Sequence, residues 1–275
     1  MNKIRINKSI KIYNDEYIIK NEEDLTDLYK YLDSKKFSNY VPIIDNKDNY
    51  SKYKYIDSIN YNNEDLALSG IKVLAELHKK TSYNKEVNID KINDIYCSLK
   101  AYINYVLDYY KNIINNILLI EYPFSSDLLL INNYYKINEM CNKSLDLLEK
   151  WLLNNTNNDK RFVLNHGNLS LEHILINDKT YFISWSKSSF DSPVLDLINF
   201  YKNTWDKTEF DYILKDYLNI FELTENELIL LCINISIPPI FIDSKSEFIR
   251  TKNVANILKY LYKTDNLIRP YCSNK

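Results

Sequence analysis

Apolar and polar positions alternate over short stretches in the first 60 residues. Ile10 and Ile12 stand before a polar turn and the apolar residues 17–19 stand after it, which predicts a β-hairpin. Apolar side chains then recur every three or four positions over residues 25–32, which predicts a helix. Residues 41–44 and 53–56 favour two further strands. This section is therefore expected to form a small α+β unit.

Longer stretches with helical spacing follow between residues 64 and 155. The first carries Ile71, Leu74 and Leu77, the second runs through residues 92–117, and the third runs through residues 130–152. In each stretch the apolar residues share one face of the helix that they predict, and such a face is buried against a core. We therefore expect three core-facing helices here.

The period shortens between residues 161 and 186. Residues 161–164 predict one strand, and residues 173–176 and 181–183 predict a hairpin around a polar turn. From residue 192 onward the spacing is helical again.

Three local signals mark helix ends in this last part of the chain. Ser192 followed by Pro193 predicts a capped helix start, and Thr224 with Glu227 predicts a capping box. The pair Pro238-Pro239 is expected to end the helix that Thr224 begins, and residues 254–261 predict a final helix. Periodicity alone thus supports an α+β protein, with a small lobe at 1–61 and a helical lobe at 62–275.

The charge balance is nearly neutral, with 35 basic and 37 acidic residues. This balance provides no general attraction to nucleic acid or to an anionic membrane surface. No run approaches 18 apolar residues and the first eight residues lack the apolar core of a signal peptide, so we expect no membrane span and synthesis in the cytoplasm. Gly70 and Gly167 are the only glycines, which excludes a glycine-rich loop that cradles phosphates.

The four cysteines lie far apart and form no CxxC pair. Neither a disulfide framework nor a zinc ribbon is expected from this spacing. Cys97 and Cys141 fall at apolar helical positions, where buried thiols are expected.

Three consecutive motifs carry the strongest functional signal. They are His-Gly-Asn-Leu-Ser-Leu-Glu-His-Ile-Leu-Ile at 166–176, Tyr-Phe-Ile-Ser-Trp-Ser at 181–186 and Asp-Ser-Pro-Val-Leu-Asp-Leu at 191–197. In sequence and spacing they resemble the catalytic segment of aminoglycoside and choline kinase-like phosphotransferases, H-G-D-x-x-x-x-N-I-L, then I-D-F/W-[DE], then D-P-x-x-D-L. The helix at 70–78 is also similar to the one that precedes this segment in that family. The resemblance implies a bilobal protein-kinase-like fold with a small reduced N-lobe, a mainly helical C-lobe and a catalytic segment at 161–197.

The residues that perform phosphoryl transfer in this superfamily are replaced. The reaction needs an Asp to orient the nucleophile, and an Asn and a second Asp to hold Mg²⁺. The matching positions here are Asn168, His173 and Ser184. An amide cannot act as a base, and Mg²⁺ prefers carboxylate oxygen to imidazole nitrogen or a neutral hydroxyl. We therefore expect no functional catalytic residue, no metal and no cofactor at these degenerate positions.

The variant H-G-x-L-S-x-x-H is similar to the spore-coat branch of this superfamily, the CotS- and YsxE-like proteins. That resemblance implies a coat-associated protein of an endospore-forming bacterium, with other proteins, including coat components, as its partners. It implies no nucleic-acid partner.

Four further residues have a structural and a functional interpretation. His166 is expected to bond backbone near the loop, with an acid/base role as the alternative, and His173 is either a loop histidine or a metal ligand. Asp196 matches the helix Asp that anchors the catalytic loop in kinases. Lys20 is either a solvent-facing lysine or similar to the strand Lys that meets nucleotide phosphates, with Asp27 as a candidate partner.

Three hypotheses therefore stand. The first is a catalytically degenerate kinase-fold protein with a structural or interaction role and a filled nucleotide pocket. The alternative is an active small-molecule phosphotransferase that uses ATP and Mg²⁺, with Glu172 or Asp191 as displaced metal ligands near Lys20. The third is a protein whose cleft holds a nucleotide or sugar without chemistry.

Overall fold

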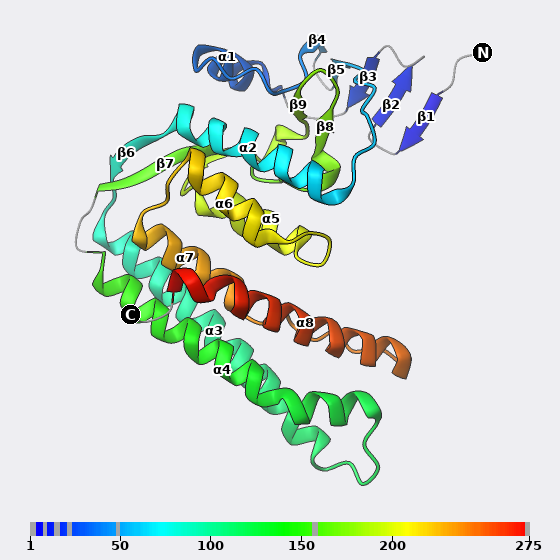
Figure 1. The fold of residues 1–275 in the computed structure, drawn as a ribbon, viewed down its shortest axis with the longest axis vertical. Helices are drawn as coiled ribbons and strands as arrows, with labels where there is room; N and C mark the ends of the chain where they lie inside the picture. Colours follow the sequence, from blue (N-terminus) through cyan, green and yellow to red (C-terminus); the bar gives the residue numbers. More distant parts are fainter. Residues whose placement is uncertain are drawn as a thin grey trace. The chain divides into compact units, whose positions relative to one another are not determined.

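The structure is a computed structural model that describes residues 4–7, 10–13, 17–20, 24–47, 50–155 and 159–272. The chain divides into two compact units (Figure 1). Unit 1 comprises residues 1–83 and 161–222, and unit 2 comprises residues 84–160 and 223–275. The predicted lobe boundary between residues 61 and 62 falls inside unit 1 and stays a prediction.

Unit 1 begins with a five-stranded antiparallel sheet in the order β1-β2-β3-β5-β4. The predicted hairpin is confirmed in β2 (Ile10–Tyr13) and β3 (Tyr17–Lys20), and its turn lies outside the described residues. The next two predicted strands are also present, with bounds shifted to β4 (Ile43–Lys47) and β5 (Tyr50–Lys54). The predicted helix is α1 (Thr26–Ser34). Only β1 (Ile4–Asn7) was not expected.

A second hairpin, β8 (Ile174–Ile176) and β9 (Thr180–Phe182), connects the other parts of unit 1. The backbone of Phe182 donates to the carbonyl of Asn39 at 2.8 Å, and Ile59 donates to the carbonyl of Ile176 at 2.9 Å. The helix α2 (Asn63–Thr81) lies against this hairpin. It approaches so closely at Gly70 that a Cβ there would stand 2.3 Å from Cδ1 of Ile174. Glycine allows this contact.

The remaining elements of unit 1 include the predicted strand near residues 161–164 and the predicted helix after Ser192, together with elements that were not predicted. The strand β7 (Asp159–Asn165) pairs with β10 (Ser189–Asp191), and the single turns η1 (Leu171–His173) and η2 (Trp185–Lys187) lie between them in the sequence. The helix α6 (Phe210–Ile220) packs against α2, and α5 (Val194–Thr204) precedes it. The start of α5 corrects one expectation. No side-chain cap is present, and the carbonyl of Ser192, not its hydroxyl, accepts the N–H of Leu195.

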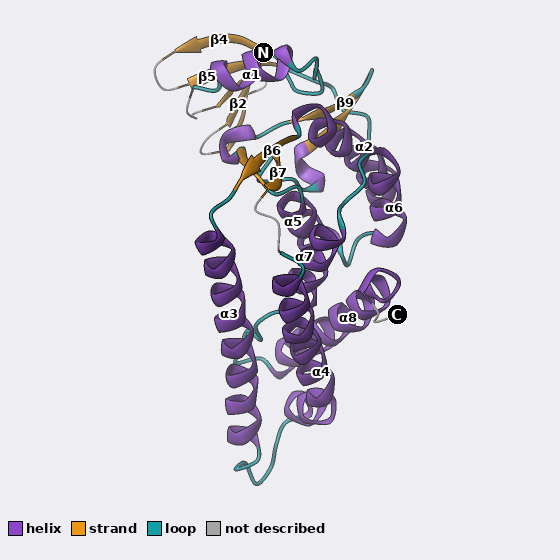
Figure 2. Cartoon of the chain, turned by 90° about the vertical axis from the view of Figure 1, so that its left-hand side faces the viewer, coloured by secondary structure: helices purple, strands orange, loops and turns teal. Residues whose placement is uncertain are grey.

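Unit 2 is a helical bundle in which α4 (Ser125–Leu153) packs against α3 (Ile89–Ile117), α7 (Glu225–Ser236) and α8 (Glu247–Cys272). Figure 2 shows α3 as a long, nearly straight helix. The predicted apolar stripe of α3 is buried at Ile103, Val106 and Tyr110. The capping box of α7 is present, since Thr224 Oγ1 accepts from the N–H of Glu227 and the Glu227 carboxylate accepts from the N–H of Thr224. The short strand β6 (Tyr83–Glu86) precedes α3.

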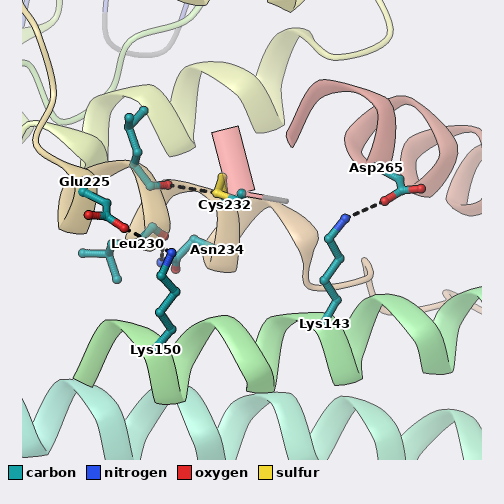
Figure 3. Close-up of a disulfide and its surroundings, with 9 residues drawn as sticks. Lys143, Lys150, Glu225, Leu230, Cys232, Asn234 and Asp265 are labelled. Atoms are coloured by element: carbon teal, nitrogen blue, oxygen red, sulfur yellow. Dashed lines mark hydrogen bonds and ion pairs between the residues drawn. A yellow bond between two sulfur atoms is a disulfide. The ribbon is translucent and has the colours of Figure 1, made fainter. Parts of the chain in front are cut away.

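A partly buried group of charges joins α8 to α4. The carboxylate of Asp265 accepts from Lys136 at 3.0 Å and from Lys143 at 2.8 Å, and Figure 3 shows the second contact. Burial raises the pKa of Asp265, but the hydrogen bonds from Lys143 and Lys136 outweigh it and lower the pKa to about 2. Asp265 is therefore ionised at neutral pH.

A disulfide joins Cys232 on α7 to Cys272 on α8, against the expectation drawn from spacing (Figure 3). The two residues lie 40 positions apart in the sequence, but the packing of α7 on α8 places their Cα atoms 6.8 Å apart. Sequence distance was a poor guide because the bundle brings the two helices together. Cys141 is buried as expected, which raises the pKa of its thiol to about 12, whereas Cys97 is exposed.

No helix in the described ranges is both long and apolar enough to span a membrane.

Candidate functional site

The carboxylate of Asp196 on α5 is completely buried beneath the loop that carries the His-Gly motif. Its two oxygens accept the backbone N–H of His166 at 2.6 Å and that of Gly167 at 2.8 Å. Burial alone would raise the pKa of Asp196, but the hydrogen bond and charge of His78, the charge of His166 and the N–H of Gly167 keep the pKa below its usual value. A charged acceptor thus fixes two consecutive backbone groups of the loop.

Two residues behind Asp196 complete a buried network that the sequence did not predict. Nε2 of His78 on α2 lies 3.3 Å from Asp196, and Nδ1 lies 2.7 Å from the hydroxyl of Tyr217 on α6. If the Tyr217 hydroxyl donates to Nδ1, Nε2–H is free to donate to the carboxylate. The signal for His78 was a histidine at the end of an apolar helical stripe, and such a residue needs polar partners inside the core.

The ring of His166 is fully buried and both of its nitrogens face backbone groups of the site. Nε2–H donates to the carbonyl of Ile183 at 2.9 Å, and Nδ1 accepts the N–H of Asn168 at 3.3 Å. Burial lowers the pKa of His166 to about 4, although the charge of Asp196 opposes this shift. At neutral pH the ring is therefore neutral, and both nitrogens are occupied in holding the loop, which leaves none for a substrate.

Gly167 adopts a backbone conformation that other residues avoid, with φ at +76°. A Cβ at this position would lie 2.0 Å from the carbonyl oxygen of Lys187. Both the positive φ and the close approach require glycine. The second of the two glycines in the chain is thus placed by the geometry of this loop.

His173 closes the same loop from its other end. Its Nδ1 donates to the carbonyl of Asn168 at 2.6 Å and lies 3.2 Å from the hydroxyl of Ser170. Among the described residues, no group of three or more His, Cys, Asp and Glu side chains is arranged to hold a metal ion. The contacts of Nδ1 stabilise the loop between Asn168 and His173.

The hydroxyl of Ser184 accepts a hydrogen bond from Nζ of Lys20 at 3.2 Å. Lys20 stands at the end of β3, and its Nζ also lies 5.6 Å from the centre of the Tyr53 ring. Ser184 occupies the left-handed region, with φ at 69°. Asp and Asn tolerate that region better than most residues because they bond locally, so this backbone would suit the Asp of the family pattern.

The candidate partner of Lys20 lies elsewhere. Asp27 is almost fully exposed on α1 and pairs with Lys30 at 3.1 Å. The structure therefore brings Lys20 to Ser184, which are 164 positions apart in the sequence, and does not bring Asp27 to Lys20.

A small cavity lies beside Lys20 and Ser184 in unit 1. Its volume is about 40 Å³, whereas sites for drug-sized ligands enclose roughly 300–1,000 Å³. Among the described residues, the lining is apolar and aromatic apart from Ser184 and two lysines, and it includes no carboxylate. The lining side chains besides Lys20 and Ser184 are Ile18, Tyr29, Val41, Tyr53, Lys54, Ile56, Leu175, Phe182 and Ile183.

The two carboxylates considered as displaced metal ligands are not part of this lining. Glu172 is exposed on η1. Asp191 is also exposed, and its carboxylate accepts the backbone N–H of Ser192 at 2.7 Å. Mg²⁺ requires oxygen ligands, usually including one or two carboxylates. The residues around Lys20 therefore do not fit a Mg²⁺-bound nucleotide.

Comparison with solved structures identifies the fold. The chain superposes on an aminoglycoside phosphotransferase from Alicyclobacillus acidocaldarius with a TM-score of 0.72 and 11% identity, over 98% of this chain and 92% of the other. It superposes on the AMP-bound spectinomycin phosphotransferase with a TM-score of 0.52 and 14% identity, over 100% and 93% of the two chains. The chain has the aminoglycoside phosphotransferase-like, protein-kinase-like fold. No protein-family model and no curated protein sequence matches it.

The expected bilobal kinase-like fold class is therefore confirmed, with a small sheet lobe and a mainly helical remainder. At 11–14% sequence identity, the similarity shows the fold and not the chemistry. The spore-coat branch rests on the sequence motif alone.

The buried neutral His166 predicts a loss of stability in mild acid. Its pKa is about 4 in the folded protein and 6.5 ordinarily, so the unfolded chain binds more protons between these values. The contribution is fully present above pH 6.5 and is lost as the pH falls toward 4. We expect the free energy of unfolding to drop between pH 7 and pH 4.5 by about 2 kcal/mol through this residue.

Urea unfolding at the two pH values measures this loss. The control is His166→Gln, whose amide can donate to Ile183 but does not titrate. This variant should be less stable at pH 7 and should lose less stability on acidification. An equal loss in both proteins would contradict the assignment of a neutral buried ring.

Proposed function

We propose that the chain is a pseudokinase, a kinase-fold protein that has lost phosphoryl transfer and acts as a structural or interaction module. The observation that carries this proposal is the cavity beside Lys20, which has a volume of about 40 Å³ and no carboxylate among the described residues that line it. Phosphoryl transfer depends on metal ions that neutralise the phosphates and on a residue that positions the nucleophile. Neither function has a suitable side chain here.

The same argument follows from the positions that match the family pattern. The base position is the amide Asn168, and the metal positions are His173 and Ser184. The ring of His173 bonds the backbone of its own loop and the hydroxyl of Ser184 accepts from Lys20. These contacts stabilise the loop without the charges that Mg²⁺ would require.

The scaffold around the changed positions is intact. Asp196 still binds the N–H groups of His166 and Gly167, and His166 still bonds the carbonyl of Ile183. A fold that keeps the interactions of its catalytic loop and lacks the reacting groups is better suited to presenting a surface than to catalysis. This contrast supports an interaction role.

The alternatives receive less support. An active phosphotransferase with displaced ligands needs Glu172 or Asp191 beside Lys20, and both carboxylates are exposed and lie outside the cavity lining. Nucleotide binding without chemistry needs room for a purine and phosphates, and the side chains of Tyr29, Tyr53 and Phe182 occupy the wall of the small cavity. The solved relatives are phosphotransferases by name, and this chain shares their fold at 11–14% identity.

The proposed setting is the coat of a bacterial endospore. Its support is the motif H-G-x-L-S-x-x-H, read here from His166 to His173, which resembles the coat-associated branch. The partners would be other coat proteins, and the chain would be made in the cytoplasm before it assembles.

Calorimetric titration of ATP into the purified chain, with and without Mg²⁺, tests the loss of the nucleotide site. We expect no saturable heat, which corresponds to a Kd weaker than about 1 mM. A thermal shift with ATP and Mn²⁺ should likewise leave the melting temperature unchanged, because a ligand that does not bind the folded state cannot stabilise it.

If heat of binding is observed, three variants and one control variant distinguish the alternative functions. Heat that requires Mg²⁺ and disappears in Glu172→Gln or Asp191→Asn would contradict the proposal in favour of the phosphotransferase. Metal-independent heat that disappears in Lys20→Ala would instead support a nucleotide-binding protein without chemistry. Lys30→Ala is the matched control for Lys20→Ala, because Lys30 is an exposed lysine on α1.

Fractionation of mature spores from the source organism tests the setting. We expect an epitope-tagged chain in the coat fraction and not in the soluble core fraction. A tagged chain that stays soluble throughout sporulation, or a source that forms no spores, would contradict the coat assignment and leave the pseudokinase proposal standing.

A further inference from the structure

One end of unit 2 carries a cluster of exposed, large apolar side chains. The cluster comes from the connection between α3 and α4 and from the segment that leads into α8. Its side chains range from 56% exposed at Phe124 to 85% exposed at Leu119. We name this cluster the apolar end, and its six most exposed members are Leu118, Leu119, Tyr122, Phe124, Ile242 and Phe248.

Polar contacts hold the segments of the apolar end together. The Arg250 guanidinium pairs with Asp127 at 2.7 Å and with Asp243 at 3.0 Å, and it lies 5.5 Å from the centre of the Phe124 ring. The carboxylate of Glu247 accepts the backbone N–H of Ser126 at 2.7 Å. In Figure 1 the α3–α4 connection and the start of α8 lie at the same end of unit 2. The segments that carry the apolar side chains are therefore held next to each other.

Such a surface is unusual for a chain that stays alone in water. Single exposed apolar residues are common and need no explanation. Contiguous apolar patches larger than a few hundred Å² generally mark interaction sites. Tyr122, Phe124 and Phe248 are 80%, 56% and 78% exposed, so at 150–250 Å² for each full side chain these three alone offer roughly 300–500 Å².

We propose that the apolar end is a self-association surface and that its occupant is a second copy of this chain. The aromatic area and a comparable area from Leu118, Leu119 and Ile242 together approach the roughly 800 Å² that each partner of a stable interface buries. A dimer with two-fold symmetry places the same patch on both sides, so an apolar patch meets an apolar patch.

The charges around the apolar end favour the same occupant. Arg250, Asp243 and Glu247 already have polar partners within the chain, and the other charged neighbours, Glu121, Lys245 and Lys252, are exposed. A rim that carries both signs of charge can pair with its own copy across a two-fold axis, whereas an anionic lipid surface would favour a larger excess of basic residues. This inference does not depend on the proposed loss of the nucleotide site.

Sedimentation velocity of the full chain, from about 1 µM to about 100 µM, tests the proposal. We expect a concentration-dependent species of twice the 32.8 kDa of the chain. The double variant Leu119→Glu/Phe248→Glu should weaken the dimer at least roughly a hundredfold, because it buries charges in the centre of the interface. Both sites are exposed in the monomer, so the fold should tolerate the changes.

The matched control is Leu153→Glu/Tyr212→Glu, which places the same charges on a leucine and an aromatic residue that are exposed outside the apolar end. It should dimerise like the parent chain. In addition, a photoreactive phenylalanine analogue at Tyr122 should crosslink two copies, with the adduct mapping to the apolar end of the other copy.

Three outcomes would overturn the proposal. The first is a parent chain that stays monomeric at about 100 µM. The second is a dimer that the Leu119→Glu/Phe248→Glu variant forms as well as the control does. The third is a monomer that floats with phosphatidylcholine or phosphatidylglycerol vesicles and loses this property in the same variant, which would make the occupant a membrane.

Discussion

The site of this protein depends on the hydrogen bonds that the buried carboxylate of Asp196 accepts. This carboxylate is fully buried and accepts the backbone N–H groups of His166 and Gly167 in the loop. It also contacts Nε2 of His78. A buried charge is costly unless hydrogen bonds surround it, and here backbone and imidazole donors do so. The loop conformation and the ionised carboxylate therefore require each other. Removing either would leave buried polar groups without partners.

The contacts that hold the loop do not involve the positions where the family pattern has its catalytic Asp residues. The groups that anchor the loop lie on α5, α2 and α6, whereas Ser184, one of the changed positions, contacts Lys20 at the end of β3. Asn168 and His173 now contribute backbone and ring contacts within the loop, and Ser184 accepts the hydrogen bond of Lys20. The family pattern has Asp at the positions of Asn168 and Ser184, and the neutral side chains here remove the repulsion between carboxylates that a metal would otherwise have to balance. The loop thus persists as structure.

The sequence was informative wherever local pattern and tertiary environment agreed. The helices with continuous apolar stripes and the capping box at Thr224 were predictable, because periodicity and capping act over a few residues. The strands β6 and β10 consist of exposed residues without an alternation of buried and exposed positions, so no local pattern predicted them. The disulfide of Cys232 depends on the packing of two helices and could not be inferred from spacing.

The candidate site divides in the same way. The motif placed His166, Asn168, His173 and Ser184 in one loop system, because family motifs preserve spacing along the chain. It did not predict that His78 would stand behind Asp196, nor that Asp27 would turn to Lys30, since both depend on how α2 and α1 pack. The size of the cavity beside Lys20 could not be predicted from the sequence, because it depends on the packing of several side chains that lie far apart along the chain.

We propose that no carboxylate delivers a metal ion to a nucleotide beside Lys20, because none of the described residues that line this cavity carries one. Electron paramagnetic resonance of Mn²⁺ with ATP, in the presence and absence of the protein, tests this claim most directly, because Mn²⁺ takes the oxygen ligands that Mg²⁺ takes. We expect that adding the protein leaves the Mn²⁺–ATP spectrum unchanged. A protein-dependent spectrum that disappears in Lys20→Ala and in Glu172→Gln would contradict it.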